Sequence, residues 1–234
     1  MSALRRIGHK GADLIVPGNT PASFDAALEH GVDMIEFDVL EHRGQLLLAH
    51  DYDHVEGAPT LEEGLAHLAS PAFAGIELDV DLKLPGYEER TVEALRAHGL
   101  VQRTLVSTMW MRSLVVLRAL EPRLRLGWSV PRLKSDPTQS WVTKVPAYAG
   151  AAWVRTKLPR SARTHIAAGR IDAVMSHWRL VTPRLVRAIK DAGGELYVWT
   201  VDDGPRIGKL ERLGVTGVIT NDPRLFQSVQ VAAE

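Results

Sequence analysis

The feature that most constrains this chain is the alternation of short apolar runs with helix-like amphipathic segments along nearly its whole length. Strand–helix alternation of this kind predicts a parallel sheet whose strands are joined by helical crossovers. The apolar runs predict strands at residues 4–9, 33–40, 75–84, 104–108, 124–130, 171–177, 195–201 and 216–220. The segments between them predict helices at 21–30, 61–70, 88–99, 111–121, 183–193 and 205–214.

Caps and breakers support these helix boundaries. Thr20 is a good N-cap with Pro21 at the first helical position, and Gly31 stops that helix. Residues 138–169 are less regular, and we expect them to be mostly helical, broken near Pro159 and ended by Gly169. A short terminal helix is expected after Pro223.

Eight strand–helix units predict a single-domain α/β fold, a (β/α)8 TIM barrel spanning residues 1–234. A doubly wound open sheet also alternates strands and helices and is the alternative. No G-x-G-x-x-G segment follows a strand, which weakens a dinucleotide-binding version of that alternative. In a barrel, the active site lies at the carboxyl ends of the strands, so the polar residues there become the candidates.

Composition narrows the function classes. Lys plus Arg (28) equals Asp plus Glu (28), so no global field favours nucleic acid or an anionic membrane as a partner. The absence of cysteine excludes disulfides, thiol catalysis and cysteine-ligated zinc. No signal peptide and no transmembrane run is evident, so we expect a cytoplasmic protein without membrane insertion. The sequence carries no signal for an oligomeric state.

Charged residues alternate with apolar ones on two neighbouring predicted strands. Glu36 and Asp38 lie two apart and therefore share one face, which would be the barrel interior. Asp79, Asp81 and Lys83 share a face of the next strand in the same way. Oxygen ligands grouped like this suit a hard cation such as Mg²⁺ or Ca²⁺. Solvated or Arg-bridged acids, and a structural Asp–Lys pair, remain the alternatives.

Two histidines and two lysines complete the expected rim. His9 and Lys10 end the first strand, and His50 follows an apolar run after the second strand. Each histidine alone is more often structural, but beside carboxylates and lysines they suit proton transfer in a phosphoryl-ester reaction. His177 would also lie at the rim and stays a weaker candidate for substrate contact. The remaining histidines lack a partner motif; they are His30, His42, His54, His67, His98 and His165.

Taken together, the dispersed motifs resemble the glycerophosphodiester phosphodiesterase family. They are HKGA, PGNT, GVDMIEFDV, LLAHD, PTLEE, LDVDLK, VWTVDD and LGVTGVITNDP, in order from His9 to Pro223. The resemblance implies a barrel enzyme that splits a phosphodiester into glycerol 3-phosphate and an alcohol. It also implies that a neighbouring hydroxyl of the substrate attacks phosphorus and that water opens the resulting cyclic phosphate.

The resemblance also assigns roles to residues of this chain. It implies His9 and His50 as general acid and base, without deciding which is which. It implies one divalent cation, Mg²⁺ or Ca²⁺, with Mn²⁺ also compatible, held by Glu36, Asp38 and Asp81. The substrate phosphate and glycerol would meet Lys10, Asn19, Lys83 and Trp199.

Several positions depart from the family pattern. Lys10 stands where an arginine is usual, which loses a planar fork on phosphate. Gly18 replaces a glutamate, Asp81 replaces a longer Glu ligand, and only eight residues separate His50 from Pro59, where the family commonly has an insertion. These changes leave two alternatives open: a related lysophospholipid- or sphingolipid-type phosphodiesterase, or a catalytically weak barrel that binds phosphorylated ligands. Exposure of Trp110, Trp128 or Trp178 at the rim would favour the lipid alternative.

Overall fold

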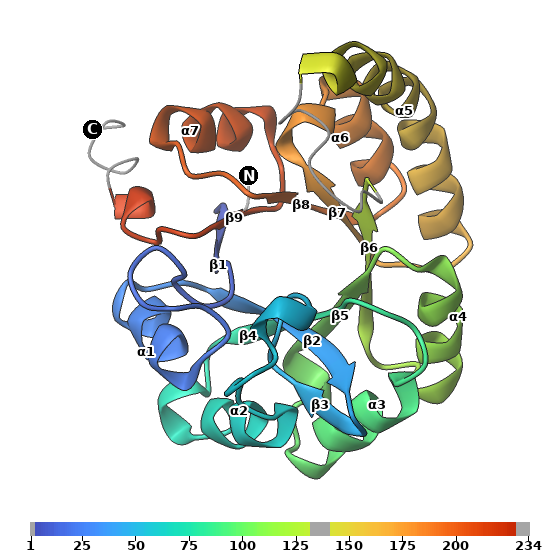
Figure 1. Ribbon diagram of the computed structural model, residues 1–234. Coiled ribbons are helices and arrows are strands. Elements are labelled where there is room, and N and C mark those ends of the chain that lie inside the picture. The colour runs from blue at the N-terminus through green and yellow to red at the C-terminus, as the bar shows by residue number, and fades with distance from the viewer. Residues whose placement is uncertain (1–2, 132–140, 228–234) are drawn as a thin grey trace.

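The computed structural model describes residues 3–131 and 141–227, with the backbone alone over 141–153. Eight parallel strands form a closed barrel surrounded by helices, so the predicted (β/α)8 fold is confirmed (Figure 1). Neighbouring strands follow chain order, and β1 pairs with both β2 and β9 to close the ring. The barrel strands are β1 Arg5–Gly8, β2 Met34–His42, β4 Glu77–Leu82, β5 Thr104–Thr108, β6 Arg125–Val130, β7 Ala173–His177, β8 Glu195–Trp199 and β9 Gly217–Thr220.

The helices fill the crossovers as expected, with two corrections. They are α1 Pro21–Glu29, α2 Leu61–Leu68, α3 Glu88–Ala97, α4 Met111–Leu120, α5 Trp141–Ala167, α6 Pro183–Lys190 and α7 Gly204–Leu213. The predicted break near Pro159 is wrong, because α5 runs through it. One missing N–H is offset there by burial of Leu158, Ala162 and Ile166 on the same helix. The second correction is an added strand, β3 Gln45–Leu47, which pairs antiparallel with the end of β2.

Two predicted helices are only partly covered by the described residues. Residues 138–140, expected to start the long helix, lie outside the described residues. After Pro223, residues 225–227 are helical and the rest of the expected terminal helix also lies outside. None of the helices in the described ranges combines the length and apolar composition that a membrane crossing requires.

The alternating faces of the strands sort apolar from polar side chains. Ile35, Phe37 and Val39 point outward into the main hydrophobic core beneath the helices. Their neighbours Glu36 and Asp38 point into the barrel and are buried there. A smaller apolar cluster fills the middle of the barrel interior: Ile7, Met34, Leu105, Ala173, Met175, Tyr197 and Ile219. Strand periodicity therefore places the acids above this inner cluster, toward the carboxyl ends of the strands.

A network of ion pairs lies at the amino-terminal end of the barrel interior. Arg5 on β1 and Arg125 on β6 both bind Glu77, at 2.8 Å and 2.6 Å. Each guanidinium also lies 3.6 Å from a carboxylate oxygen of Glu195. Tyr197 accepts a hydrogen bond from Arg5 and donates one to Glu195. Two positive and two negative charges thus neutralise one another below the apolar cluster.

The seam between β1 and β2 is short and carries its own clamp. Only Ile7 with Met34 and Gly8 with Ile35 are registered partners in this strand pair. Just before them, Asp33 accepts hydrogen bonds from the backbone N–H of Arg6 at 2.8 Å and from its guanidinium at 2.8 and 3.1 Å. The side chain of Asp33 thus extends the pairing that closes the barrel.

Candidate active site

The turn after β1 positions His9 and Lys10. His9 donates its backbone N–H to Thr220 on β9, and Gly11 donates its own to the Glu36 carbonyl on β2. Gly8 and Gly11 are needed because a Cβ at either would lie within 2.6 Å of backbone atoms. Lys10 adopts a left-handed φ of 50°, which is uncommon for a residue with a side chain. Packing on both sides therefore fixes this turn at the mouth of the barrel.

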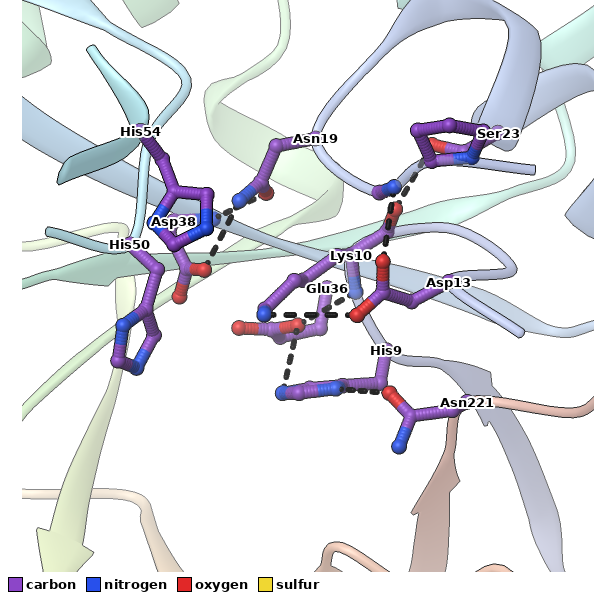
Figure 2. A network of polar contacts seen from close by, with 12 residues as sticks. His9, Lys10, Asp13, Asn19, Ser23, Glu36, Asp38, His50, His54 and Asn221 are labelled. Carbon is purple, nitrogen blue, oxygen red and sulfur yellow. Dashed lines mark hydrogen bonds and ion pairs between the residues drawn. The ribbon is translucent and has the colours of Figure 1, made fainter. Parts of the chain in front are cut away.

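Hydrogen bonds orient the His9 ring, and Figure 2 shows the one between the ring and Asn221. Asn221 donates its amide to Asp202 at 2.7 Å, which turns its Oδ1 toward Nδ1 of His9 at 2.5 Å. Since that oxygen only accepts, Nδ1 carries the proton, and Nε2 of the neutral ring is left as a base. Burial lowers the pKa of His9, outweighing the nearby charge of Asp38.

Three carboxylates converge on one point of the interior. Asp38 on β2 and Asp81 on β4 are registered partners, and Glu36 stands one pleat below Asp38. One oxygen from each of the three lies within 4.8 Å of the other two. Asn19, at a left-handed φ of 58°, fixes Asp38 by donating to Oδ2 at 2.9 Å and accepting its backbone N–H at 3.0 Å. The predicted ligand set is thus brought together by two strands and the loop before α1.

The three acids around this point are not fully neutralised by the nearby side chains, which favours a bound cation. Lys83 contacts Asp38 and lies 2.5 Å from Asp81, but one ammonium does not balance three acids. Burial, followed by the charge of Asp38, raises the pKa of Glu36 well above its ordinary value. Burial also acts to raise the pKa of Asp38, but Lys83 outweighs it and lowers that pKa. Oxygen donors with excess negative charge fit a hard divalent ion.

Asp79 is a buried acid beside this set. Its Oδ1 has no hydrogen-bond partner among the described residues. Burial, with a smaller contribution from the charge of Asp81, raises the pKa of Asp79 to about 8. A carboxyl group with this pKa is mostly protonated at neutral pH and adds little to the local negative charge.

A cavity of about 180 Å³ opens above the carboxylates and gathers most of the predicted site. His9, His50, Glu36, Asp81, Lys83 and Trp199 all line it. His50 reaches it from the loop after β3, where Asp51 binds its Nδ1 at 3.0 Å and leaves the ring half-exposed. Asp38 is fully buried beneath, in contact with Lys83.

Lys10 and Asn19 line a second, adjoining cavity of about 460 Å³, which shares His50 with the first. His177 lines neither cavity, but its ring contacts Trp199 edge-on at 5.2 Å. Sequence reasoning missed Asn221 and Asp202, although both belong to motifs that it quoted, because contacts between distant loops leave no local pattern.

Asp13 supplies a carboxylate where the family pattern led us to look to position 18. Its Oδ2 lies 3.5 Å from Nζ of Lys10, and its Oδ1 accepts the backbone N–H of Gly18 at 2.8 Å. A Cβ at Gly18 would stand 2.5 Å from Asp13 and 2.7 Å from Lys10. Glycine at 18 and aspartate at 13 therefore form one arrangement, and Lys10 is still paired with an acid.

Comparison with known proteins identifies the relatives of this chain. The model of the glycerophosphoryl diester phosphodiesterase family matches residues 54–225. The glycerophosphodiester phosphodiesterase of Caldanaerobacter subterraneus subsp. tengcongensis is 27% identical over 93% of both chains. That of Bacillus subtilis is 25% identical over 96% of this chain and 85% of its own.

Solved structures agree on the fold. A glycerophosphodiester phosphodiesterase from Agrobacterium tumefaciens has a TM-score of 0.73 at 20% identity, covering 98% of this chain and 100% of its own. A phosphodiesterase of Oleispira antarctica, solved in complex with its product sn-glycerol-3-phosphate, has a TM-score of 0.72 at 21% identity, covering 97% and 96%. The chain therefore belongs to the glycerophosphoryl diester phosphodiesterase family and is a phosphoric diester hydrolase.

Proposed function

We propose that this protein hydrolyses glycerophosphodiesters to glycerol 3-phosphate and an alcohol, with one bound divalent cation. The observation that carries the proposal is the cavity in which His9 and His50, from separate loops, face Glu36, Asp81 and Lys83. The family match and the product bound to the Oleispira antarctica relative support this substrate class.

The ring orientations support one assignment of the proton transfers. In the proposed reaction, Nε2 of His9 takes the proton of the glycerol hydroxyl next to the phosphoester as that oxygen bonds to phosphorus. The bond from phosphorus to the alcohol oxygen breaks, and His50 gives that oxygen a proton. Water then opens the cyclic phosphate with the two roles reversed, which restores both histidines. We assign the acid role to His50 because its Nδ1 is held by Asp51 at 3.0 Å, which leaves Nε2 as the ring nitrogen that can reach the leaving oxygen.

The other residues bind and orient the substrate. Lys83 places a positive charge in the cavity where the phosphate gains negative charge. Lys10 and Asn19 border the adjoining cavity, where one end of the substrate can extend. Trp199 offers an apolar ring to the carbon skeleton.

Glu36, Asp38 and Asp81 are the residues that would hold the cation, since their oxygens already converge. A cation bound there supplies Lewis-acid polarisation of a phosphoryl oxygen. Mg²⁺, Ca²⁺ and Mn²⁺ all suit an all-oxygen site.

Turnover of glycerophosphocholine tests the proposal. Purified protein with Mg²⁺, Ca²⁺ or Mn²⁺ should release glycerol 3-phosphate. A coupled enzymatic assay measures that release. EDTA, His9→Ala and His50→Ala should each reduce kcat by at least about 100-fold. His67→Ala is a matched control, because that histidine pairs with Asp25 on the outer helices. No metal-dependent turnover of any glycerophosphodiester would refute the proposal.

A lysophospholipid substrate is the second candidate. Leu14 and Tyr52, on loops that border the mouth, expose 61% and 56% of their surface. Trp110, Trp128 and Trp178 are only half-buried, so the strongly exposed indole rim that would favour a lipid enzyme is not seen. Faster release of choline from lysophosphatidylcholine than of glycerol 3-phosphate from glycerophosphocholine would favour this candidate.

A further inference from the structure

An aromatic and basic cluster lies at the mouth of the barrel, on the side of β7 and β8. It consists of Trp178 and Arg179, in the turn Trp178–Leu180 after β7, and Arg206 in the first turn of α7. The guanidinium carbon of Arg206 lies 3.9 Å from the centre of the Trp178 ring, and that of Arg179 lies 4.9 Å from it. We refer to these three residues as the rim cluster.

Both guanidinium groups lie over the Trp178 indole ring. Within residues 3–131 and 141–227, neither Arg179 nor Arg206 forms an ion pair with a carboxylate. The nearest acids in sequence are engaged elsewhere. Asp203 caps α7 by accepting the backbone N–H of Arg206 at 2.8 Å, and Asp202 binds Asn221. Among the residues that the structure describes, the rim cluster therefore presents two forks of N–H donors without an anionic partner.

Helix stability does not explain why Arg206 lies in the first turn of α7. The first turn of a helix carries partial positive charge and favours acidic side chains, yet Arg206 lies there. The two guanidinium groups gathered on the Trp178 ring outnumber the one carboxylate, Asp203, that caps this helix, so a net positive charge remains at this point of the mouth. Such an arrangement favours an external anion.

Ring contacts connect the rim cluster to the catalytic cavity. Trp199 lines that cavity. The centre of the His177 ring lies 5.2 Å from the centre of the Trp199 ring. On its other side, His177 lies 5.5 Å from Trp178. His177 and Trp199 are registered partners at the ends of β7 and β8, so this row of rings runs along the mouth. A substrate group leaving the cavity past Trp199 would meet the two guanidiniums next.

We propose that the rim cluster binds a second anionic group, a carboxylate or a phosphate, on the alcohol part of the substrate. The enzyme would thereby prefer glycerophosphodiesters with anionic head groups. This inference rests on the proposed function. A substrate group fits better than an anionic membrane surface, because none of the strongly exposed large apolar side chains of the described residues belongs to the rim cluster. They are Leu14 and Tyr52, on loops after other strands, and Val115 and Val116 on α4.

Two matched pairs of substrates test this preference. Glycerophosphoserine differs from glycerophosphoethanolamine by one carboxylate, and glycerophosphoinositol 4-phosphate differs from glycerophosphoinositol by one phosphate. The double variant Arg179→Gln/Arg206→Gln should raise KM for the more anionic member of each pair by roughly three- to tenfold, with kcat nearly unchanged. KM for the other member should stay the same. Arg212→Gln, at the far end of α7, is the control and should change neither.

The remaining outcomes separate the possible failures. Equal KM changes within each pair, or the same change in Arg212→Gln, would overturn the inference. The double variant could instead lose the binding of wild-type protein to equimolar phosphatidylserine–phosphatidylcholine vesicles while the KM ratio within each substrate pair stays unchanged. That result would overturn the inference in favour of a membrane contact. If wild-type protein hydrolyses none of the four compounds, the proposed function fails. Calorimetric titration then decides the inference: tighter binding of glycerophosphoserine that the double variant loses supports it, and equal binding refutes it.

Discussion

The orientation of His9 depends on two residues from the far end of the chain. Asp202 follows β8 and Asn221 follows β9, and together they hold the imidazole with its Nδ1 protonated. Without them, the ring could expose either nitrogen to the cavity. The side-chain identity of His9 thus suffices for basicity, while its neighbours decide which atom is the base.

Asn221→Ala should lower kcat by about 10- to 100-fold while changing KM little, because the ring loses its orienting acceptor. The pH profile of kcat is the second readout, since a ring freed to choose its tautomer titrates differently. Asp222→Asn is the neighbouring control, as Asp222 pairs with Arg224 on the surface. An Asn221→Ala enzyme with wild-type kcat would show that His9 needs no such support.

Gly18→Ala should destabilise the protein by about 1–3 kcal/mol, because the added methyl group displaces the Asp13 carboxylate. Gly75→Ala is the matched control, since a Cβ there has no neighbour within 4 Å and the change should be within about 0.5 kcal/mol. Urea unfolding followed by circular dichroism measures both. Equal midpoints for the two variants would contradict the close packing of Gly18, Asp13 and Lys10.

These residues show where sequence reasoning at this scale succeeds and stops. Glu36 and Asp38 could be placed in the interior because strand periodicity fixes which side chains share a face. Asp13 and Asn221 could not, because their contacts join loops whose relative positions depend on the closed barrel. The pairing of Lys10 with Asp13 likewise replaces an acid that the family pattern led us to seek at position 18.

At the scale of elements, periodicity and caps predicted all eight barrel strands, and the misses have physical causes. The strand β3 is three residues long, too short to show alternation, and exists because it pairs with the end of β2. The helix α5 continues through Pro159 because its buried face is held against neighbouring elements, a contribution that local propensity omits.

Asp33→Asn should weaken the seam between β1 and β2 by about 1 kcal/mol at pH 7, a figure discounted because both partners are more than a third exposed. Burial acts to raise the pKa of Asp33, but hydrogen bonds from Arg6 outweigh it and lower the pKa below 3.8. This stabilisation is therefore present above pH 3.8 and is lost as pH falls through the lower native pKa.

Urea midpoints of wild type and Asp33→Asn, measured from pH 7 down to pH 3, would check the seam prediction. The two midpoints should differ at neutral pH and approach each other at the acid end. A difference that stays constant over the whole range would mean that the charge of Asp33 contributes nothing to barrel closure.

At the scale of the whole molecule, a net charge of zero conceals strong local separation. Acids gather in the barrel interior around Lys83, and the rim cluster places positive charge on the mouth beside them. The balanced composition predicts no global field that would attract nucleic acid, but it has no bearing on where anions and cations meet at the site.

A divalent ion should raise the melting temperature, because ligands that bind only the folded state stabilise it by mass action. At an ion concentration 100 times Kd, the gain is about 2.7 kcal/mol. Differential scanning calorimetry with Mg²⁺, Ca²⁺ or Mn²⁺, and again after EDTA, measures it. The Glu36→Gln/Asp38→Asn variant should show no such shift. Identical melting curves for wild type with and without all three ions would rule out the cation site.

The ion-pair network of Arg5, Glu77, Arg125 and Glu195 determines how substrate enters the enzyme and how products leave it. With these side chains and the apolar cluster above them occupying the interior, the barrel has no passage from end to end. The substrate must enter, and both products must leave, through the mouth of the barrel. The alcohol lies nearer this opening and is free to diffuse away first. Glycerol 3-phosphate, which is bound deeper, should therefore act as a competitive inhibitor when it accumulates.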